Sequence, residues 1–436
     1  MGNTIVAPTV ASGASTGGAK STASAARFAL LATPLISVTF LSKFGFPPFG
    51  SQGLGVSLFV MLAALLIGSI AGGISIEPRR LTFYFLMIGS LGLMQIFQPD
   101  SFSPTSLLLL VAVHLPYVFT VPQSNDGERI IKFFIQIATV FALLGIAQYG
   151  LMRVVNVSYL FPIENFVPDT FIVQHFNHQA VTEYGSHDYR ANGVFLLEPS
   201  FFSQLLAVAI VAELGTLARL TRLALFALAL LVSYSGTGII VLAICLPLGI
   251  VAQRRWGLLL VGLCALVVLI PLQEYLHVDR LLSRIGEFAS SRSSGYARFV
   301  GGFYLFDHFL WPDPWRTLFG YGAGSFTSYA SHDAAGEMAL FKIVFEFGLV
   351  GAVAYFGFLF ACLFYSPAPR LLTLAVGVTY LLSGIYIPFA HGLALSLLLW
   401  NSAPSKVGRA EWLRDLAHRD SVRNPATAYL VPQIRG

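Results

Sequence analysis

Charged residues are scarce in this sequence. Asp, Glu, Lys and Arg together make up 11% of the 436 residues, whereas a soluble globular protein carries about 25%. The chain therefore cannot cover a water-facing surface with polar groups, and its composition excludes an ordinary soluble enzyme or binding module. Hydrophobic residues make up 56% and aromatic residues 14%, so we predict an integral membrane protein.

Cysteine is also rare. The three cysteines, Cys245, Cys264 and Cys362, each lie inside an apolar run, without a CxxC pair or the Cys/His spacing of a metal site. They are expected to be small core residues, which excludes a disulfide scaffold and a zinc site. No Asp-rich cluster indicates a bound metal or a nucleotide sugar. We therefore predict no cofactor, no metal and no nucleic-acid partner.

Long apolar runs dominate the remainder of the chain. Each membrane crossing needs roughly 20 apolar residues. The candidate spans are 28–44, 54–74, 81–98, 105–121, 130–152, 195–214, 219–234, 236–253, 256–275, 339–364, 371–386 and 388–402. The seventh and eighth runs, and likewise the last two, have almost no loop between them and could be hairpins that stop partway.

The predicted fold class is an all-α polytopic membrane protein with about twelve spans, in the range of ten to fourteen. The membrane domain is expected over 27–402. Residues 1–26, rich in Gly, Ser, Ala and Thr, are predicted to be a disordered cytoplasmic tail. Residues 403–436 are predicted to be a second cytoplasmic tail.

The basic residues of the short connections predict the orientation in the bilayer. Connections on one side hold Arg79, Arg80, Arg129, Lys132, Arg219, Arg222, Arg254, Arg255 and Arg370. Those on the other side hold almost nothing basic beyond Lys43. By the positive-inside rule both termini face the cytoplasm. Two long segments, 153–194 and 276–338, then form outer (periplasmic) loops, and a chain that keeps its other connections short is expected to use these two.

The first outer loop ends in "YRANGVFLLEPSFFSQ", residues 189–204. Proline lacks an N–H and disfavours helix in the residue before it, so Pro199 is predicted to begin a helix with Glu198 at its N-terminal flank. A carboxylate at the membrane edge, beside the positive end of a helix dipole and a cavity, is a candidate functional group. Arg190 is expected near the rim. The alternative is that Glu198 only caps the helix and pairs with Arg190.

The second outer loop interleaves aromatic residues with Arg298 and His332. Aromatic faces beside arginines suit sugars and phosphates, although Trp and Tyr are also enriched where any membrane meets water. The run "GYGAGS" at 320–325 is either a backbone nest for an anion or a plain turn. His332, with Glu337 nearby, is either a solvated loop histidine or a catalytic group.

Five short motifs occur in a fixed order. They are "RANGVFLLEPSFFS" (190–203), "YSGTGIIVLAI" (234–244), "YARFVGGFYLF" (296–306), "LFGYGAGSF" (318–326) and "FEFGLVGAVAYF" (345–356). This order, with two long outer loops, resembles the O-antigen polymerase and ligase superfamily. Within it, the chain is most similar to polymerases of secreted exopolysaccharides of the xanthan type. The resemblance covers about 190–356 in motif and the whole chain in topology. It implies a multi-span glycosyltransferase of the bacterial inner membrane.

One departure separates the chain from the ligases of this superfamily. Ligases carry a histidine followed by Asn about eleven residues before the glycine that opens a GLxG run. Counting back from Gly348, that position holds Glu337 (348 − 11 = 337), and His332 lies five residues earlier. The resemblance therefore implies a polymerase more than a ligase, and it leaves the identity of the catalytic base open.

The resemblance implies transfer of a growing glycan from undecaprenyl diphosphate to a hydroxyl of the next lipid-linked repeat unit. The residues expected to bind the diphosphate or the substrate are Arg190, Arg298, Tyr296 and Arg292. Glu198, His332 and Glu337 are the alternative catalytic residues. The expected partners are the lipid-linked donor and acceptor and the lipid bilayer, with a flippase and a chain-length regulator as further candidates.

Two other classes of function compete with this one. A flippase or ion-coupled transporter predicts inverted repeats and ionisable groups at mid-span, and His114 and His391 are the nearest to such groups. A non-catalytic assembly partner is the third possibility.

Overall fold

The structure is a computed structural model that describes residues 16–46, 54–98, 102–122, 126–152, 154–182, 188–216, 218–253, 293–333 and 335–401. Over these residues the chain is mostly helical. The strands described are β1 (Ser75–Ile76) and β2 (Phe119–Thr120), which pair antiparallel. The predicted all-α class is confirmed at this coarse level.

The apolar helices coincide with the predicted spans. They are α1 (Thr16–Phe40), α2 (Val56–Ile70), α3 (Pro78–Ile96), α4 (Pro104–His114), α5 (Gly127–Leu151), α8 (Pro199–Gly215), α9 (Leu220–Val232), α10 (Gly236–Gln253), α17 (Ala339–Phe364), α18 (Arg370–Leu382) and α19 (Pro388–Ala394). A 3₁₀ turn, η2 (Leu115–Val118), extends α4, and a π turn, η6 (Leu395–Leu399), extends α19. The predicted span 256–275 lies outside the described residues.

The two outer loops are built from short helices. The first contains α6 (Val157–Leu160), α7 (Pro162–Phe166) and the 3₁₀ turn η3 (Asp169–Phe171). The second contains α13 (Ser294–Phe299), α14 (Gly301–Leu305), the π turn η5 (Phe306–Leu310), α15 (Pro314–Phe319) and α16 (Phe326–Ala330).

Helix length alone does not establish the number of membrane spans. Among the described helices, α5 and α17 are long and apolar enough to cross a bilayer. The other apolar helices are shorter, such as α9 and α18 with 13 residues each. At 1.5 Å per residue such a helix measures about 20 Å, short of the ~30 Å hydrocarbon core.

Helix α1 begins earlier than the predicted edge of the membrane domain. Residues 16–26 were expected in a disordered tail, but they form the first turns of α1. The expectation had rested on the Gly and Ser content of the segment. The alanines at positions 19, 23, 25 and 26 are the best helix formers and continue the apolar helix toward the N-terminus.

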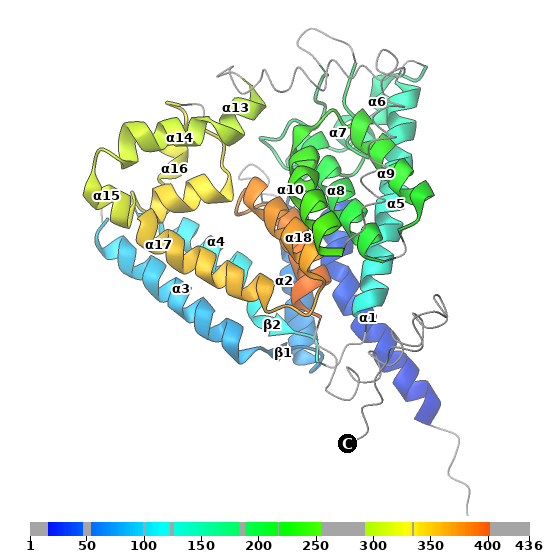
Figure 1. Cartoon of the computed structure of the whole chain (residues 1–436), viewed down its shortest axis with the longest axis horizontal. Coiled ribbons are helices and arrows are strands. Elements are labelled where there is room, and N and C mark those ends of the chain that lie inside the picture. Colours follow the sequence, from blue (N-terminus) through cyan, green and yellow to red (C-terminus); the bar gives the residue numbers. More distant parts are fainter. Residues whose placement is uncertain are drawn as a thin grey trace, which may run out of the picture.

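Helix α8 lies at the centre of the molecule. Every residue from Pro199 to Leu214 is buried, as expected of a helix that is apolar on all sides. It packs against α5, α9, α10 and α18, while α17 packs along α3 on the other side (Figure 1). Glu198 therefore stands at one end of a helix that is buried over nearly its whole length.

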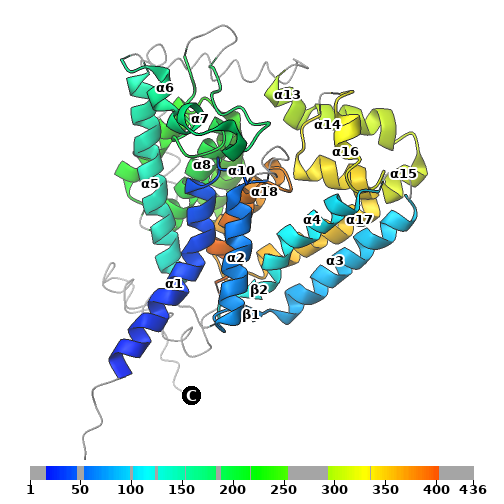
Figure 2. The ribbon, with the colours of Figure 1, turned by 180° about the vertical axis from the view of Figure 1, so that it is seen from behind.

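The two predicted sides of the membrane lie at opposite ends of the molecule. Helices α6, α7 and α13 of the outer loops lie at one end, and β1, β2 and the start of α1 lie at the other (Figures 1 and 2). Asn401, the last described residue, forms a bridge with Val121 directly after β2. The basic connection at Arg80 also lies at that end, since its guanidinium donates to the carbonyl oxygens of Phe119 and Leu399.

Candidate functional site

The helix boundary predicted at Pro199 is confirmed. Pro199 is the first residue of α8, and Glu198 is its N-cap residue with extended backbone angles. The carbonyl oxygen of Glu198 accepts from the backbone N–H groups of Phe201 and Phe202, at 3.1 and 3.3 Å. The Glu198 side chain makes no capping hydrogen bond to its own helix. Backbone geometry therefore starts the helix and leaves the carboxylate available for other partners.

The Glu198 carboxylate forms an ion pair with Arg298, a hundred residues away in the sequence. Arg298 Nη2 donates to Glu198 Oε2 at 3.0 Å. The Ser200 hydroxyl donates to the same oxygen at 3.0 Å, and the backbone N–H of Asn177 donates to Oε1 at 2.9 Å. Both charged side chains keep contact with solvent, with 15% of Glu198 and 27% of Arg298 exposed. The site is thus a held but accessible carboxylate–guanidinium pair at a helix N-terminus.

Arg190 is not the ion-pair partner that the sequence suggested for Glu198. Within the described residues Glu198 pairs with Arg298, whereas Arg190 Nη2 donates to the carbonyl oxygen of Thr182 at 3.4 Å. Arg190 and Glu198 are eight residues apart, but the intervening backbone folds inward. The two left-handed residues Gly193 (φ 67°) and Val194 (φ 72°) turn the chain there, so Arg190 is directed toward its own loop.

The non-helical segment before α8 is buried in protein, which was one of the two environments expected for it. Asn192 and Leu196 are fully buried. The Gln148 carboxamide on α5 accepts from the backbone N–H groups of Asn192 and Gly193 at 3.0 and 3.1 Å, and it donates to the Asn192 side chain. A single glutamine therefore satisfies the backbone that a helix would otherwise satisfy.

His178 fastens the first outer loop to the backbone beside Glu198. Its Nδ1 lies 2.9 Å from the carbonyl oxygen of Leu197, and its Nε2 lies 2.8 Å from that of Val173. The next residue toward the N-terminus, Asn177, supplies the backbone donor to Glu198. Neither contact was predictable from the sequence, because Asn177 acts through its backbone and His178 is one of six histidines in the two predicted outer loops.

A cluster of buried hydroxyls joins two of the sequence motifs beneath Glu198. Ser203 Oγ lies 3.1 Å from Ser235 Oγ and 3.0 Å from Thr237 Oγ1. Thr237 also donates to the carbonyl oxygen of Ser200, and the backbone N–H of Gly238 donates to Ser203 Oγ. The turn between α9 and α10 is thereby fixed to the first turn of α8, so motif 234–244 supports motif 190–203.

Lys43 is a buried anchor for the first outer loop. Its ammonium forms an ion pair with Glu164 of α7 and donates to the carbonyl oxygen of Val194. It lies beyond the end of α1 and its side chain is fully buried. This basic residue, predicted on the outer side, therefore serves tertiary structure, a role that the positive-inside rule does not describe.

The glycine run 320–325 and the residue after it bind the backbone and the carboxylate of a segment of α17. The backbone N–H groups of Tyr321 and Gly322 donate to the carbonyl oxygens of Phe345 and Glu346, at 3.0 and 2.8 Å. The N–H of Phe326 donates to the Glu346 carboxylate at 3.3 Å. Glu346 is fully buried. The sequence predicted either a plain turn or a backbone nest for an anion. The loop is a turn, and the anion it encloses is the carboxylate of Glu346.

Glycine is required at the crossing of the last two motifs. Gly320 and Gly348 both have left-handed φ angles, 76° and 64°. A Cβ atom on Gly348 would lie 2.3 Å from the carbonyl oxygen of Leu318, and one on Gly320 would lie 2.4 Å from that of Glu346. The break in α17 at Gly348 therefore exists to admit the glycine loop.

Glu337, a predicted catalytic residue, lies in an ion-pair network at the start of α17. Lys342 Nζ lies 3.1 Å from Glu337 Oε2 and 3.7 Å from Glu346 Oε1. Thr327 donates to Glu337 at 2.9 Å. The backbone N–H of Gly336 donates to the carbonyl oxygen of Ala297 at 2.7 Å. Because Gly336 precedes Glu337 and Ala297 precedes Arg298, this bond brings the segments that carry the two residues together.

His332 and Tyr296 lie on the solvent side of the second loop. His332 is exposed and its ring packs against Phe309 at 5.6 Å. Tyr296 stacks with Tyr304, with ring centroids 6.0 Å apart. Partial desolvation raises the pKa of Tyr296, and the nearby hydroxyl of Tyr304 and carboxylate of Asp333 raise it further. Arg292, the remaining predicted binding residue, lies outside the described residues.

The mid-span histidines His114 and His391 meet in the core. His391 Nε2 lies 2.7 Å from the carbonyl oxygen of Ile385, so it carries the proton, and Nδ1 accepts from Tyr117. In the same way His114 Nδ1 faces the carbonyl oxygen of Leu110, and Nε2 lies 2.7 Å from the Tyr380 hydroxyl. Both imidazoles have a hydrogen-bond partner at each ring nitrogen in a buried cluster, as expected for a structural role.

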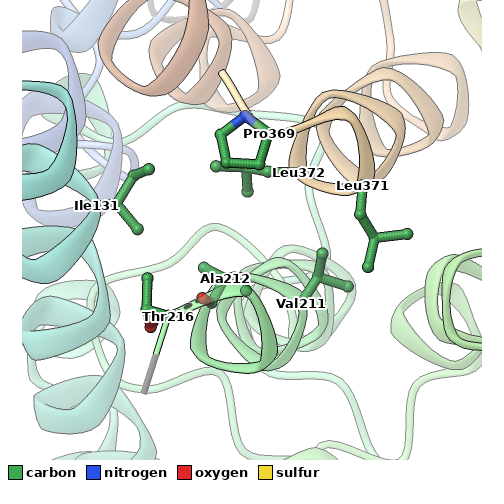
Figure 3. Close-up of a pocket in the computed structure, with 8 residues that line it drawn as sticks. Ile131, Val211, Ala212, Thr216, Pro369, Leu371 and Leu372 are labelled. Atoms are coloured by element: carbon green, nitrogen blue, oxygen red, sulfur yellow. Dashed lines mark hydrogen bonds between the residues drawn. The ribbon is translucent and has the colours of Figure 1, made fainter. Parts of the chain in front are cut away.

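An apolar pocket lies at the end of α8 away from Glu198 (Figure 3). Its lining residues are Ile131, Val211, Ala212, Gly215, Thr216, Pro369, Leu371 and Leu372. None of them carries a charge, so this pocket does not suit a diphosphate. It is about 25 Å from Glu198 along the helix axis, at 1.5 Å per residue.

The predicted motifs therefore form two contact groups at the outer end of the molecule. Motifs 190–203, 234–244 and 296–306 meet at Glu198 and Arg298, while motifs 318–326 and 345–356 meet at Glu346. The Gly336–Ala297 bond connects the groups. Among the described residues no group of three His, Cys, Asp or Glu side chains is placed to hold a metal ion.

No protein-family model, no curated protein and no solved structure matches this chain.

Proposed function

We propose that the protein is an inner-membrane polysaccharide polymerase, which transfers a growing glycan from undecaprenyl diphosphate to the next lipid-linked repeat unit at the periplasmic face. The observation that carries the proposal is the Glu198–Arg298 pair, held at the N-terminus of α8 with both side chains partly open to solvent. A guanidinium beside a helix N-terminus is suited to bind phosphate oxygens.

In this reaction the acceptor hydroxyl oxygen bonds to the anomeric carbon of the donor, and the bond from that carbon to the diphosphate oxygen breaks. The acceptor proton passes to a base, and undecaprenyl diphosphate leaves with the bonding electrons. Arg298 neutralises the charge that develops on the diphosphate. Glu198 orients the guanidinium through Oε2, and its other oxygen is held by Asn177.

Three carboxylate or imidazole groups were candidates for the base. Glu198 lies in direct contact with Arg298. Glu337 follows Gly336, whose backbone N–H donates to the carbonyl oxygen of Ala297, the residue before Arg298. His332 is displaced toward the solvent side of the loop and packs on Phe309. We therefore favour Glu198 or Glu337 over His332, since a base must reach the hydroxyl that attacks beside the diphosphate.

The proposal includes a topology. We infer about twelve spans in the bacterial inner membrane, both termini in the cytoplasm, and both loops, 153–194 and 276–338, in the periplasm. The separation of the loop helices from β1 and β2, at opposite ends of the molecule (Figure 2), supports this arrangement. The expected partners are the lipid-linked substrates, with a flippase and a chain-length regulator as further candidates.

Purified protein in lipid vesicles, supplied with a purified lipid-linked repeat unit, tests the function. A polymerase converts the unit into a ladder of longer lipid-linked chains. A ligase-type transferase leaves the unit unpolymerised but moves the glycan to a lipid A–core acceptor. A transporter makes no new glycosidic bond and moves the lipid-linked unit across the bilayer. If the intact lipid-linked unit is supplied and no longer chains form, the proposal of a polymerase is contradicted.

A further inference from the structure

Four polar and aromatic side chains of the second outer loop form one surface group that the function above does not use. They are Tyr296, Tyr304, His308 and Asp333, named here the Tyr–His patch. The rings of Tyr296 and Tyr304 are nearly parallel, at 15°, and their 6.0 Å separation means that they are offset. His308 Nδ1 lies 2.8 Å from Asp333 Oδ1.

The patch faces solvent while the opposite side of the same helices is buried. Along α14 and η5, Gly301, Gly302, Leu305, Phe306 and Leu310 are buried, whereas Phe303, Tyr304, Asp307 and His308 are exposed. The exposed fraction is 46% for Tyr304 and 59% for the His308 side chain. A helix that presents two polar-tipped side chains on its open face can receive a ligand there without rearranging the core.

Local geometry fixes the His308 ring. The π turn η5 places His308 opposite Asp333, and π turns inside helices occur frequently at functional sites. Because the Asp333 carboxylate accepts the Nδ1–H, the Nε2 lone pair of a neutral His308 is available to a hydrogen-bond donor. The arrangement thus offers an acceptor nitrogen and carboxylate oxygens beside two aromatic faces.

The patch continues from Arg298 along one helical run. Residues 294–310 are helical apart from Val300, so His308 lies about 15 Å from Arg298 at 1.5 Å per residue. A catalytic base must lie within hydrogen-bond reach of the attacking hydroxyl, and we assign His308 to sugar binding rather than to that role. A short oligosaccharide bound to a diphosphate at Arg298, however, spans such a distance.

The chemistry of the patch matches a sugar chain. The C–H face of a pyranose packs on an aromatic ring, while its hydroxyls donate to carboxylate and imidazole acceptors. The sugar attached to the diphosphate must lie next to Arg298, so the sugars that follow it extend away from that residue. The Tyr–His patch lies in one of the directions in which these sugars can extend.

We propose that the Tyr–His patch is a binding subsite for the growing glycan, and that it retains the donor chain between successive transfers. This inference rests on the proposed polymerase function for the identity of the glycan. It assigns Tyr296 to sugar binding, in place of the diphosphate role expected from the sequence.

The test measures binding of a delipidated oligosaccharide of several repeat units to purified protein, by calorimetry, and the length of polymer made from lipid-linked substrate. Tyr304→Ala and His308→Ala are each expected to weaken binding about tenfold, which corresponds to about 1.4 kcal/mol, and to shorten the polymer, since each removes an aromatic or hydrogen-bonded contact. Tyr304→Phe keeps the ring and is expected to keep the affinity. Trp311→Ala, an exposed aromatic of the same loop that packs against Phe306, is the matched control and is expected to change neither.

The outcomes separate the subsite from the function. Weakened binding in the two alanine variants supports the subsite even in a preparation that makes no polymer, in which case the polymerase proposal fails alone. Active polymerisation with the affinity and chain length of Tyr304→Ala and His308→Ala equal to those of Trp311→Ala overturns the subsite and leaves the function standing.

Discussion

At Glu198 the backbone and the side chain have separate partners, and this decides how substitutions there would act. The backbone carbonyl starts α8, while the carboxylate holds Arg298, Ser200 and Asn177. Because the side chain makes no capping bond to its own helix, its removal does not remove a cap. The effect of a mutation at this position therefore reports on the ion pair.

We expect Glu198→Gln to lower polymer yield per folded enzyme by roughly 10²-fold or more, as loss of a catalytic or charge-orienting carboxylate does. The amide cannot accept with both ends, so one of the contacts from Arg298, Ser200 and Asn177 is lost along with the charge. Glu198→Asp retains charge and is the matched comparison. Near-normal yield from the Gln variant would make Glu198 a structural residue and move attention to Glu337.

Arg298→Lys keeps the positive charge and loses the planar fork that binds two phosphate oxygens. We expect it to retain little polymer synthesis. Arg316→Lys serves as the control, because Arg316 stays near Asp313 and Tyr321 on its own segment, and it is expected to be much milder. Equal yields from the two variants, measured at equal membrane expression, would remove the argument for a clamp at Arg298.

Among the helices, α17 shows how an interruption can be more informative than a regular run. The motif "FEFGLVGAVAYF" contains Gly348, and the sequence alone does not explain why a glycine stands there. The structure does, because the loop 320–325 crosses α17 at this residue. The start of α8 was predictable because proline chemistry is local. The Arg298 contact was not, since it joins residues a hundred positions apart, and sequence proximity favoured Arg190 instead.

We expect Gly348→Ala to destabilise the protein by at least about 2 kcal/mol, from the left-handed backbone and the close carbonyl of Leu318 together. Gly357→Ala lies on the same helix, where an added Cβ meets nothing within 4 Å, and it is expected to leave stability unchanged or slightly raised. Melting temperatures of the detergent-solubilised variants give the comparison. Similar values for both would show that the crossing tolerates a side chain.

At the scale of the whole molecule, composition predicted the helical class, and apolar runs placed the described helices within a few residues of their positions, except for the start of α1. The number of crossings did not follow, because length and hydropathy qualify only α5 and α17 among the described helices. Helices shorter than a full span, such as α9 and α18, pack against the buried helix α8. Contacts between distant segments, including Lys43 with Glu164, lie beyond what local patterns encode.

Cysteine labelling tests the arrangement of the two ends. A cysteine at Ser331 is expected to react with a membrane-impermeant maleimide from outside intact spheroplasts, and one at Lys132 only after permeabilisation. Both positions are exposed, while the native Cys245 and Cys362 are buried. Labelling of the Ser331 position from the cytoplasm alone would overturn the assignment of chemistry to the outer loops.

The ion pair at the N-terminus of α8 also determines what charge a ligand of Arg298 meets. The Glu198 carboxylate holds the guanidinium through Nη2, so a diphosphate bound there meets a pair with no net charge rather than a lone cation. Its affinity is therefore expected to be moderate, and a moderate affinity would let the spent carrier lipid leave after each transfer. That affinity would depend on how firmly Asn177 and Ser200 hold the carboxylate beside the guanidinium.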